Sequence, residues 1–102
     1  SAAVDASSIV LLDPLPAGVT YNSGTTVTFT NGTTASGLNA FNAATMVTYS
    51  SQVSGGAPFT YTPSGAFDAN VRGLRIAPTG TMAAATATTQ PSFTIRFRAR
   101  VN

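Results

Sequence analysis

The sequence contains no cysteine, histidine, tryptophan, lysine or glutamate. Without cysteine, the chain forms no disulfide and offers no thiolate to a metal. Without histidine, lysine, cysteine or glutamate, its many serine and threonine hydroxyls lack the usual bases that activate a nucleophile. Only 8% of the residues are charged, against about 25% in ordinary soluble domains. Small polar side chains therefore cover the surface, which suits close lateral packing in an assembly with low entropic cost, and equally suits an ordinary secreted bacterial domain with threonine-rich strands.

The only acidic residues are Asp5, Asp13 and Asp68. A carboxylate pair or a Ca²⁺ site would have to be built from these three, but no Asp-x-Asp spacing occurs. The turn at Asp13-Pro14 accounts for one of them without any chemistry. Lysine-dependent isopeptide cross-links are excluded because the chain has no lysine. We therefore predict no catalytic residues, no metal and no cofactor, and expect that the protein is not an enzyme.

The length of 102 residues and the 43% hydrophobic content predict one folded domain with a single core. Residues 1–8 are small and polar and are expected to form an arm or lead-in to a domain over residues 9–102. No stretch approaches the roughly 18 apolar residues of a membrane span, and no signal peptide is recognisable. The net charge of +2 is small. We expect neither a membrane span nor a nucleic-acid partner.

The last part of the chain has the strongest pattern. Residues 93–101 alternate strictly between apolar and polar side chains, which predicts one strand of roughly 30 Å with a buried face and an exposed face. The apolar positions are Phe93, Ile95, Phe97, Ala99 and Val101. The positions between them include Arg96, Arg98 and Arg100.

Those three arginines form a candidate interaction face, here called the arginine face. Their spacing of about 6–7 Å along a strand is close to the phosphate spacing of nucleic acids. However, the sequence has no lysine-rich region and no aromatic row on the same face, which nucleic-acid binding would require. We therefore favour a solvated face, or one that contacts carbonyls or carboxylates of a neighbouring molecule.

Further short strands are predicted from alternating segments that are bounded by turn residues. At residues 71–76 a bulge at Gly73 is needed to bring Val71 to the apolar side. Asn31-Gly32 predicts a two-residue hairpin turn, and with Thr33 it also matches a glycosylation sequon. The predicted strands are residues 9–12, 19–21, 26–30, 45–50, 59–62, 71–76 and 93–101. About seven antiparallel strands predict an all-β, immunoglobulin-like β-sandwich.

The first of these strands is an unbroken apolar run of Ile9, Val10, Leu11 and Leu12. Such a run fits a strand that is covered on both faces. In a two-layer sandwich only the inner face is covered by the domain itself. The outer face must then be covered by loops or by a neighbouring molecule. We take these four residues as a candidate assembly edge.

Three segments resemble a known family of surface proteins. Residues 13–21 (DPLPAGVTY) resemble its Asp-x-Leu-Pro-Ala-Gly signature. Residues 67–68 with 71–80 (VRGLRIAPTG), and residues 91–93 with 97–98, are similar to later parts of its proteobacterial members. The family is the conserved-repeat domain of bacterial and archaeal surface proteins, catalogued as domain of unknown function number eleven. The resemblance implies an immunoglobulin-like sandwich, export, and a structural role at the cell surface, with no catalytic residues.

The chain departs from that family in one respect. Family members usually have a strand upstream of the apolar run at residues 9–12, and here only residues 1–8 precede it. Either the domain is truncated or the missing strand comes from elsewhere. An unpaired edge can be filled by a strand from a neighbouring copy, and head-to-tail contacts of this kind generate filaments. We expect a self-assembling subunit of an extracellular filament or layer, with itself as partner. The alternatives are a passive spacer or an adhesive glycan-binding module that uses Tyr21, Tyr49 or Tyr61.

Overall fold

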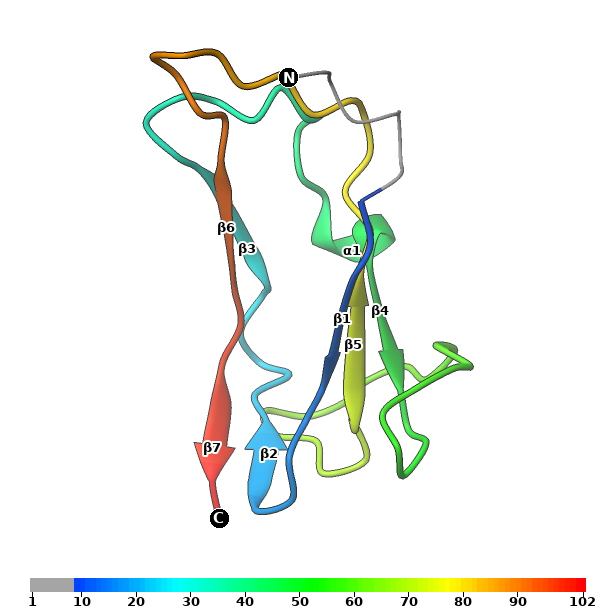
Figure 1. The fold of residues 1–102 in the computed structure, drawn as a ribbon. Coiled ribbons are helices and arrows are strands. Elements are labelled where there is room, and N and C mark those ends of the chain that lie inside the picture. The colour runs from blue at the N-terminus through cyan, green and yellow to red at the C-terminus, as the bar shows by residue number, and fades with distance from the viewer. Residues whose placement is uncertain (1–8) are drawn as a thin grey trace.

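The computed structural model describes residues 9–102, so the arm expected at residues 1–8 lies outside the described residues. Seven short strands and one helical turn are arranged in two layers (Figure 1). All strand pairs are antiparallel. The prediction of an all-β sandwich with about seven antiparallel strands is confirmed.

The first layer is a three-stranded sheet in the order β1-β5-β4. Its strands are β1 (Leu11–Pro14), β4 (Val47–Ser50) and β5 (Gly73–Ile76). The central strand aligns Ile76 with Leu11 on one side and with Val47 on the other. Ile76 and Val47 are buried, so this row faces the interior. The neighbouring row, which contains Leu12 and Arg75, faces outward by the alternation of a strand.

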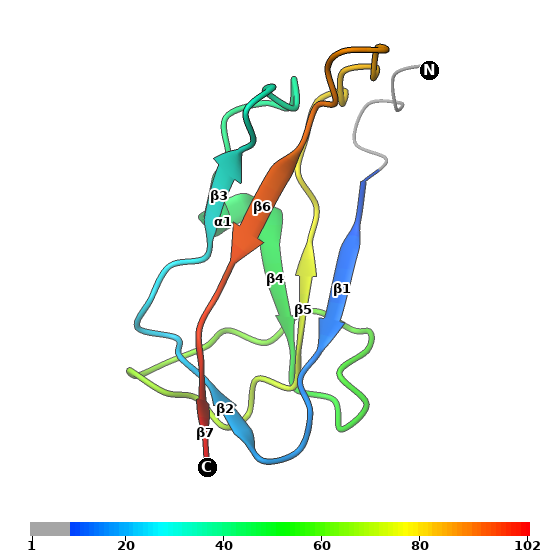
Figure 2. The same cartoon turned by 60° about the vertical axis from the view of Figure 1, so that its left-hand side comes forward.

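The second layer is a long two-stranded ribbon that is interrupted in its middle. The strands β2 (Val19–Tyr21) and β7 (Ala99–Val101) pair at one end. At the other end β3 (Thr28–Asn31) pairs with β6 (Phe93–Arg96). The C-terminal segment therefore runs along the whole ribbon as β6 and β7 (Figure 2).

The prediction of one continuous strand over residues 93–101 is wrong at Phe97 and Arg98, where β6 ends before β7 begins. Six residues lie between the paired positions Tyr21 and Thr28, whereas only two lie between their partners Ala99 and Arg96. Because the two segments differ in length, their pairing cannot remain in register.

The buried face predicted for this segment is only partly present. Phe93, Ile95 and Phe97 are half-buried and alternate with exposed neighbours, as predicted. Ala99 and Val101 are exposed, Val101 to 82% of its surface, which corrects that part of the prediction. The reason is that β7 pairs with β2 in a sheet of only two strands.

The predicted bulge at Gly73 is confirmed. Ser50 pairs with Gly73, and its carbonyl also accepts a hydrogen bond from the Arg72 N–H at 2.7 Å. Two residues thus face one, which is the pattern of a β-bulge. As a result Val71 joins Leu74 in the core, with 2% of its surface exposed.

The hairpin predicted at Asn31-Gly32 does not form. β3 pairs with β6, a partner distant in the sequence, and not with the segment that follows Gly32. The Asn31 side chain instead accepts hydrogen bonds from the N–H and the hydroxyl of Ser36. These side-chain bonds satisfy the loop locally, which is how asparagine competes with a regular ladder.

Other predicted strands are shifted or shorter than expected. The strand predicted at residues 9–12 is found two residues later, at Leu11–Pro14, so that Asp13-Pro14 belongs to the strand and not to a turn. The strands predicted at residues 26–30 and 71–76 are observed as β3 and β5, over Thr28–Asn31 and Gly73–Ile76. The strand predicted at residues 45–50 begins as the one-turn helix α1 (Ala43–Met46), which Asn42 caps by accepting from the Ala44 N–H. The strand predicted at residues 59–62 is reduced to a single bridge between Tyr61 and Tyr49.

The core lies between the layers and is built from both of them. Its buried members are Tyr21, Val27, Val47, Val71, Leu74 and Ile76. Phe41, in the loop before α1, packs against this core. Its ring stacks on Phe29, and Phe29 stacks on Phe93, with ring centroids 5.4 Å and 5.1 Å apart. These rings join the loop to β3 and β6.

Candidate assembly edges and arginine face

The candidate assembly edge lies at the border of the first sheet. Among residues 9–102, β1 is an outer strand and pairs with β5 alone. The Leu15 N–H donates to the Arg72 carbonyl at 2.8 Å, so this position points toward β5. Since backbone groups alternate along an antiparallel strand, Val10 and Leu12 point their N–H and C=O groups away from the sheet. Pro14 has the same orientation and has no N–H, so it ends the usable edge.

The side chains of this edge are more exposed than the sequence predicts. Val10 is 41%, Leu11 38% and Leu12 62% exposed, while Ile9 is half-buried. The double coverage expected for this run is therefore absent among residues 9–102, because β1 borders the sheet. What the structure provides is an apolar strand with one free backbone side.

A second open edge, which the sequence does not predict, is formed by the outer side of the C-terminal segment, residues 93–101. The Arg98 carbonyl accepts from the Asn22 N–H, and the Ser92 carbonyl accepts from the Gly32 N–H, so these even-numbered positions face the ribbon partner. The odd-numbered positions of residues 93–101 consequently point their backbone groups outward. Among residues 9–102 these outward groups have no strand partner. A row of apolar alternate positions identifies a buried face, but it says nothing about which neighbour a strand has.

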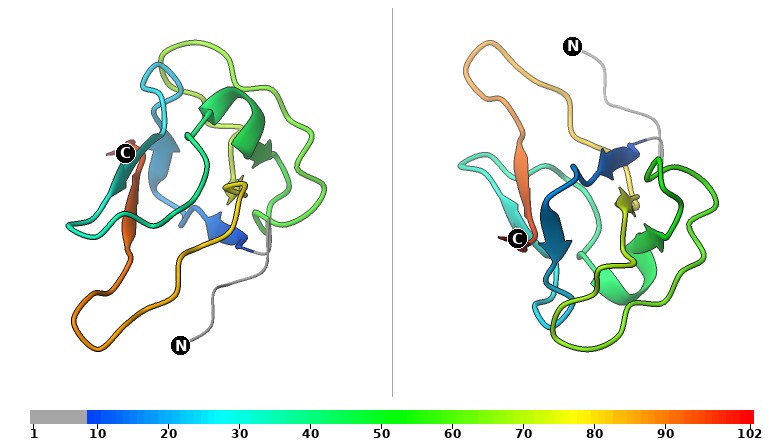
Figure 3. Two further views of the ribbon diagram at one scale, coloured as in Figure 1. Left: turned by 90° about the horizontal axis from the view of Figure 1, so that it is seen from above. Right: turned by 90° about the horizontal axis from the view of Figure 1, so that it is seen from below.

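The two open edges lie on the same side of the molecule. Figure 2 shows β1 beyond β5 and β6 beyond β3 on that side, and the view from above in Figure 3 agrees. On the opposite side, Tyr61 bridges to β4 and Asp68 bridges to β2, while β3 has no strand partner on that side among residues 9–102. The Asp68 N–H donates to the Tyr21 carbonyl at 3.0 Å. The segment around residues 59–68 therefore covers part of one side of the sandwich, whereas the opposite side has two strands that are open among residues 9–102.

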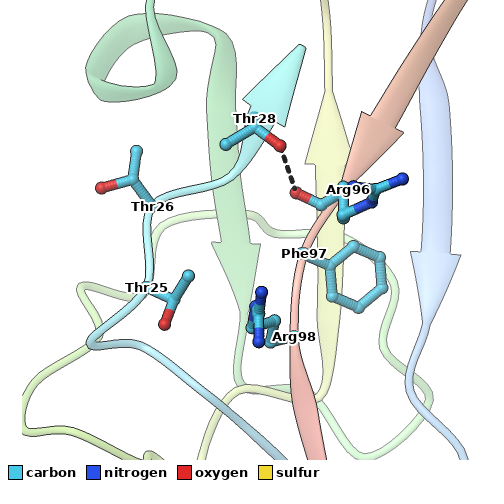
Figure 4. A pocket seen from close by; sticks show the side chains of 6 residues that line it. All are labelled: Thr25, Thr26, Thr28, Arg96, Phe97 and Arg98. Atoms are coloured by element: carbon cyan, nitrogen blue, oxygen red, sulfur yellow. Dashed lines mark hydrogen bonds between the residues drawn. The ribbon is translucent and has the colours of Figure 1, made fainter. Parts of the chain in front are cut away.

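The members of the arginine face do not point in one direction. Arg98 lies on the side of its strand that faces Thr25 and Thr26, whereas the guanidinium of Arg96 is turned away from these threonines (Figure 4). The guanidinium of Arg100 lies 4.2 Å above the Phe67 ring, a cation–π contact. The three side chains are exposed and come from the same segment, but the break at Phe97 separates their surroundings.

Asp68 is the buried acidic residue of the described chain, with 6% of its surface exposed. Its carboxylate accepts hydrogen bonds from the Tyr61 hydroxyl at 2.8 Å and from the N–H groups of Ser64 and Asn70, both at 2.9 Å. Burial alone would raise the pKa of Asp68, but these three donors outweigh it and hold the pKa below its ordinary value. The hydrogen bond to Asp68 raises the pKa of Tyr61. The Asp68 carboxylate therefore holds the loop around residues 61–70 together, and its oxygens already accept hydrogen bonds from that loop.

The tyrosines considered for glycan binding have different positions. Tyr21 is buried, and its hydroxyl lies 3.3 Å from that of Tyr49. Burial, together with this hydrogen bond, raises the pKa of Tyr21. Tyr49 and Tyr61 are half-buried and line an open groove of about 300 Å³ beside β4, with Phe59. Tyr21 thus belongs to the core, and the other two can reach a ligand.

Comparisons with protein-family models, with curated proteins and with solved structures find no match. Within residues 9–102, no group of three or more acidic, histidine or cysteine side chains is placed to hold a metal ion. In the same part of the chain, no helix has the length and apolar character to cross a membrane.

Proposed function

We propose that this chain is a non-enzymatic structural subunit, or a repeat domain, of a bacterial extracellular filament or surface layer that assembles from copies of itself. The observation that carries the proposal is the pair of open strand edges on one side of the sandwich, β1 in one layer and β6–β7 in the other. Exposed strand edges template pairing with another chain.

The side chains beside these edges support the proposal. Val10, which directly precedes β1, Leu11 and Leu12 on β1, and Val101 on β7 are exposed large apolar residues. Their burial on association is worth about 25 cal/mol per Å² of apolar area. The added backbone hydrogen bonds supply direction and register. The low content of charged residues keeps electrostatic repulsion between copies small.

The arginine face restricts how the copies can pair. If two C-terminal strands paired antiparallel about Phe97, Arg96 of one copy would face Arg98 of the other. Directly opposed like charges destabilise a strand pair. The β6–β7 edge is therefore better suited to an extended segment of different sequence, such as residues 1–12 of a neighbouring copy. Such a contact joins unlike surfaces, and repetition of it gives an open chain of subunits.

Substitutions at Leu12 test this mode of assembly. Leu12→Pro removes an N–H that points to the open edge and leaves the bonds between β1 and β5 intact. Leu12→Ala is the matched control, because it shortens the exposed side chain and keeps the N–H. Light scattering should show that the proline variant no longer assembles, whereas the alanine variant assembles more weakly than the parent chain. Far-UV circular dichroism should show that both variants fold. Assembly of the proline variant equal to that of the alanine variant would rule out strand addition at β1.

The second candidate is an adhesive, glycan-binding module, and the groove beside β4 is the observation that favours it. Its lining combines Tyr49, Phe59 and Tyr61 with several threonines. Saturable binding of an oligosaccharide by the monomer, lost in Phe59→Ala, would favour this reading over assembly. A chain that neither assembles nor binds would leave the role of a spacer.

A further inference from the structure

A second hollow lies where the ribbon of the second layer is interrupted. It has a volume of about 180 Å³ and is lined by Thr25, Thr26, Thr28, Arg96, Phe97 and Arg98 (Figure 4). It exists because the segment between Tyr21 and Thr28 is four residues longer than the segment opposite it, so the two strands separate at this point. We call it the threonine–arginine cavity.

Within residues 9–102, the polar groups of this cavity have few hydrogen-bond partners. The Arg98 guanidinium lies on the side of the threonines (Figure 4). Within residues 9–102, the hydroxyls of Thr25 and Thr26 form no hydrogen bond, and the Thr28 hydroxyl makes only a long one of 3.5 Å to the Arg96 carbonyl. A guanidinium offers a planar fork of donors that matches an oxyanion, while hydroxyls both donate and accept.

Within residues 9–102, no acidic side chain neutralises Arg98. Among residues 9–102 no ion pair includes Arg98; the Asp68 carboxylate already has three donors, and Asp13 lies on β1 in the other layer. The neighbouring Phe97 adds an apolar wall and packs against the core, with its ring 6.1 Å from that of Tyr21. The cavity thus combines one guanidinium turned toward the threonines (that of Arg98), three hydroxyls and one aromatic ring.

We propose that the threonine–arginine cavity binds the carboxylate or sulfate group of an acidic saccharide. The guanidinium would hold the anion, and the threonines would hydrogen-bond the hydroxyls of the sugar, since both kinds of group can donate and accept. A nucleic acid fits less well, because a single free arginine without an exposed aromatic row provides neither charge neutralisation nor stacking. This inference goes beyond self-assembly and gives the subunit a means of attachment to an acidic surface polysaccharide.

Saturation-transfer difference NMR tests the proposal, because it detects weak ligands on monomers and on large assemblies alike. The probes are digalacturonic acid, its neutral counterpart galactobiose, and sodium sulfate as a competitor. Digalacturonic acid should give a saturable signal and galactobiose a much weaker one. Arg98→Gln should weaken digalacturonate binding about tenfold, as expected for the loss of one charge-assisted contact. Thr26→Val should weaken it to a smaller degree.

Arg75→Gln is the control, because it removes the same charge from the outer face of the other layer. It should leave binding unchanged. Equal loss in both arginine variants would show a general charge effect and would overturn the proposal, as would an absent signal for digalacturonic acid. Equal signals from the neutral and the acidic disaccharide would overturn the role of the anion. Displacement by sulfate at concentrations equal to those of the disaccharide would overturn the role of the sugar. None of these outcomes depends on whether the chain assembles.

Discussion

Replacement of Asp68 by asparagine is the sharpest test of how the loop opposite the open edges is held. The change keeps the size of the side chain and removes its charge. In the parent chain Oδ2 accepts from the Tyr61 hydroxyl and the Ser64 N–H, and Oδ1 accepts from the Asn70 N–H. An asparagine has one oxygen and one NH₂ group in these two places.

Neither orientation of the amide satisfies all the donors. If the oxygen replaces Oδ2, the NH₂ group faces the Asn70 N–H; if it replaces Oδ1, the NH₂ group faces the Ser64 N–H. The Tyr61 hydroxyl can turn and accept, but a backbone N–H cannot. A buried donor without a partner costs about 1–3 kcal/mol, and the loss of a charged acceptor adds to this. We therefore expect Asp68→Asn to lower the free energy of unfolding by about 2 kcal/mol, or Tm by roughly 8–16 °C for a domain of this size.

Asp13→Asn makes the same chemical change at an exposed position of β1 and serves as the control. Surface changes of this kind usually stay within about 0.5 kcal/mol. The free energy of unfolding should be measured by urea titration followed by circular dichroism, under conditions where the chain is monomeric. If both variants lose equally little stability, Asp68 does not organise the loop as described.

Three further predictions concern the core, the glycines and pH. Leu74→Ala should destabilise the fold by about 2–5 kcal/mol, because Leu74 is completely buried. Val53→Ala, at a residue that is 90% exposed, should be nearly neutral. Similar urea midpoints for the two variants would contradict the placement of the core. Gly73→Ala should destabilise the fold by at least about 1–3 kcal/mol, because a Cβ there would meet the backbone of the facing loop at 2.8 Å; Gly56→Ala, whose nearest contact is a serine hydroxyl at 3.5 Å, is the control, and equal losses in the two variants would refute the tight approach. Because the pKa of Asp68 is lowered in the folded state, the stability that its carboxylate contributes is fully present above about pH 3.9, the ordinary aspartate pKa. This contribution is lost as the pH falls through the lower pKa of the folded state. The free energies of unfolding of the parent chain and of Asp68→Asn should therefore converge between neutral pH and pH 2, and a constant difference would contradict this.

The parts of the fold that the sequence predicts are those set by local patterns. Strict alternation places Phe93, Ile95 and Phe97 on a half-buried face, and the need to bring Val71 to the apolar side correctly indicates a bulge at Gly73. These features depend on the period of two of a strand, which is visible in any short window of residues.

The parts that escape prediction depend on contacts between distant segments. Asn31-Gly32 has the composition of a hairpin turn, but β3 pairs with β6 more than sixty residues later, and the loop is held by Ser36 instead. The interruption at Phe97 arises from the extra length of residues 22–27 opposite it, which cannot be known before the pairing is known.

For the candidate sites too, local patterns are predictable from the sequence, whereas features that depend on contacts between distant segments are not. The run at residues 9–12 indicates an apolar strand that needs cover, and the structure places it at a sheet border. That the C-terminal strand forms a second border, and that both borders lie on one side, follows only from the arrangement of the layers. Asp68 is acidic and looks available in the sequence, yet three donors from its own loop occupy it.

The size of the native material tests the central claim most directly. Light scattering at several concentrations, combined with negative-stain electron microscopy, should show growth into long regular filaments or sheets as the concentration rises. A closed dimer of constant size would show that the two open edges pair with each other and would contradict an open assembly. A monomer of 10.3 kDa at all concentrations would contradict self-assembly altogether.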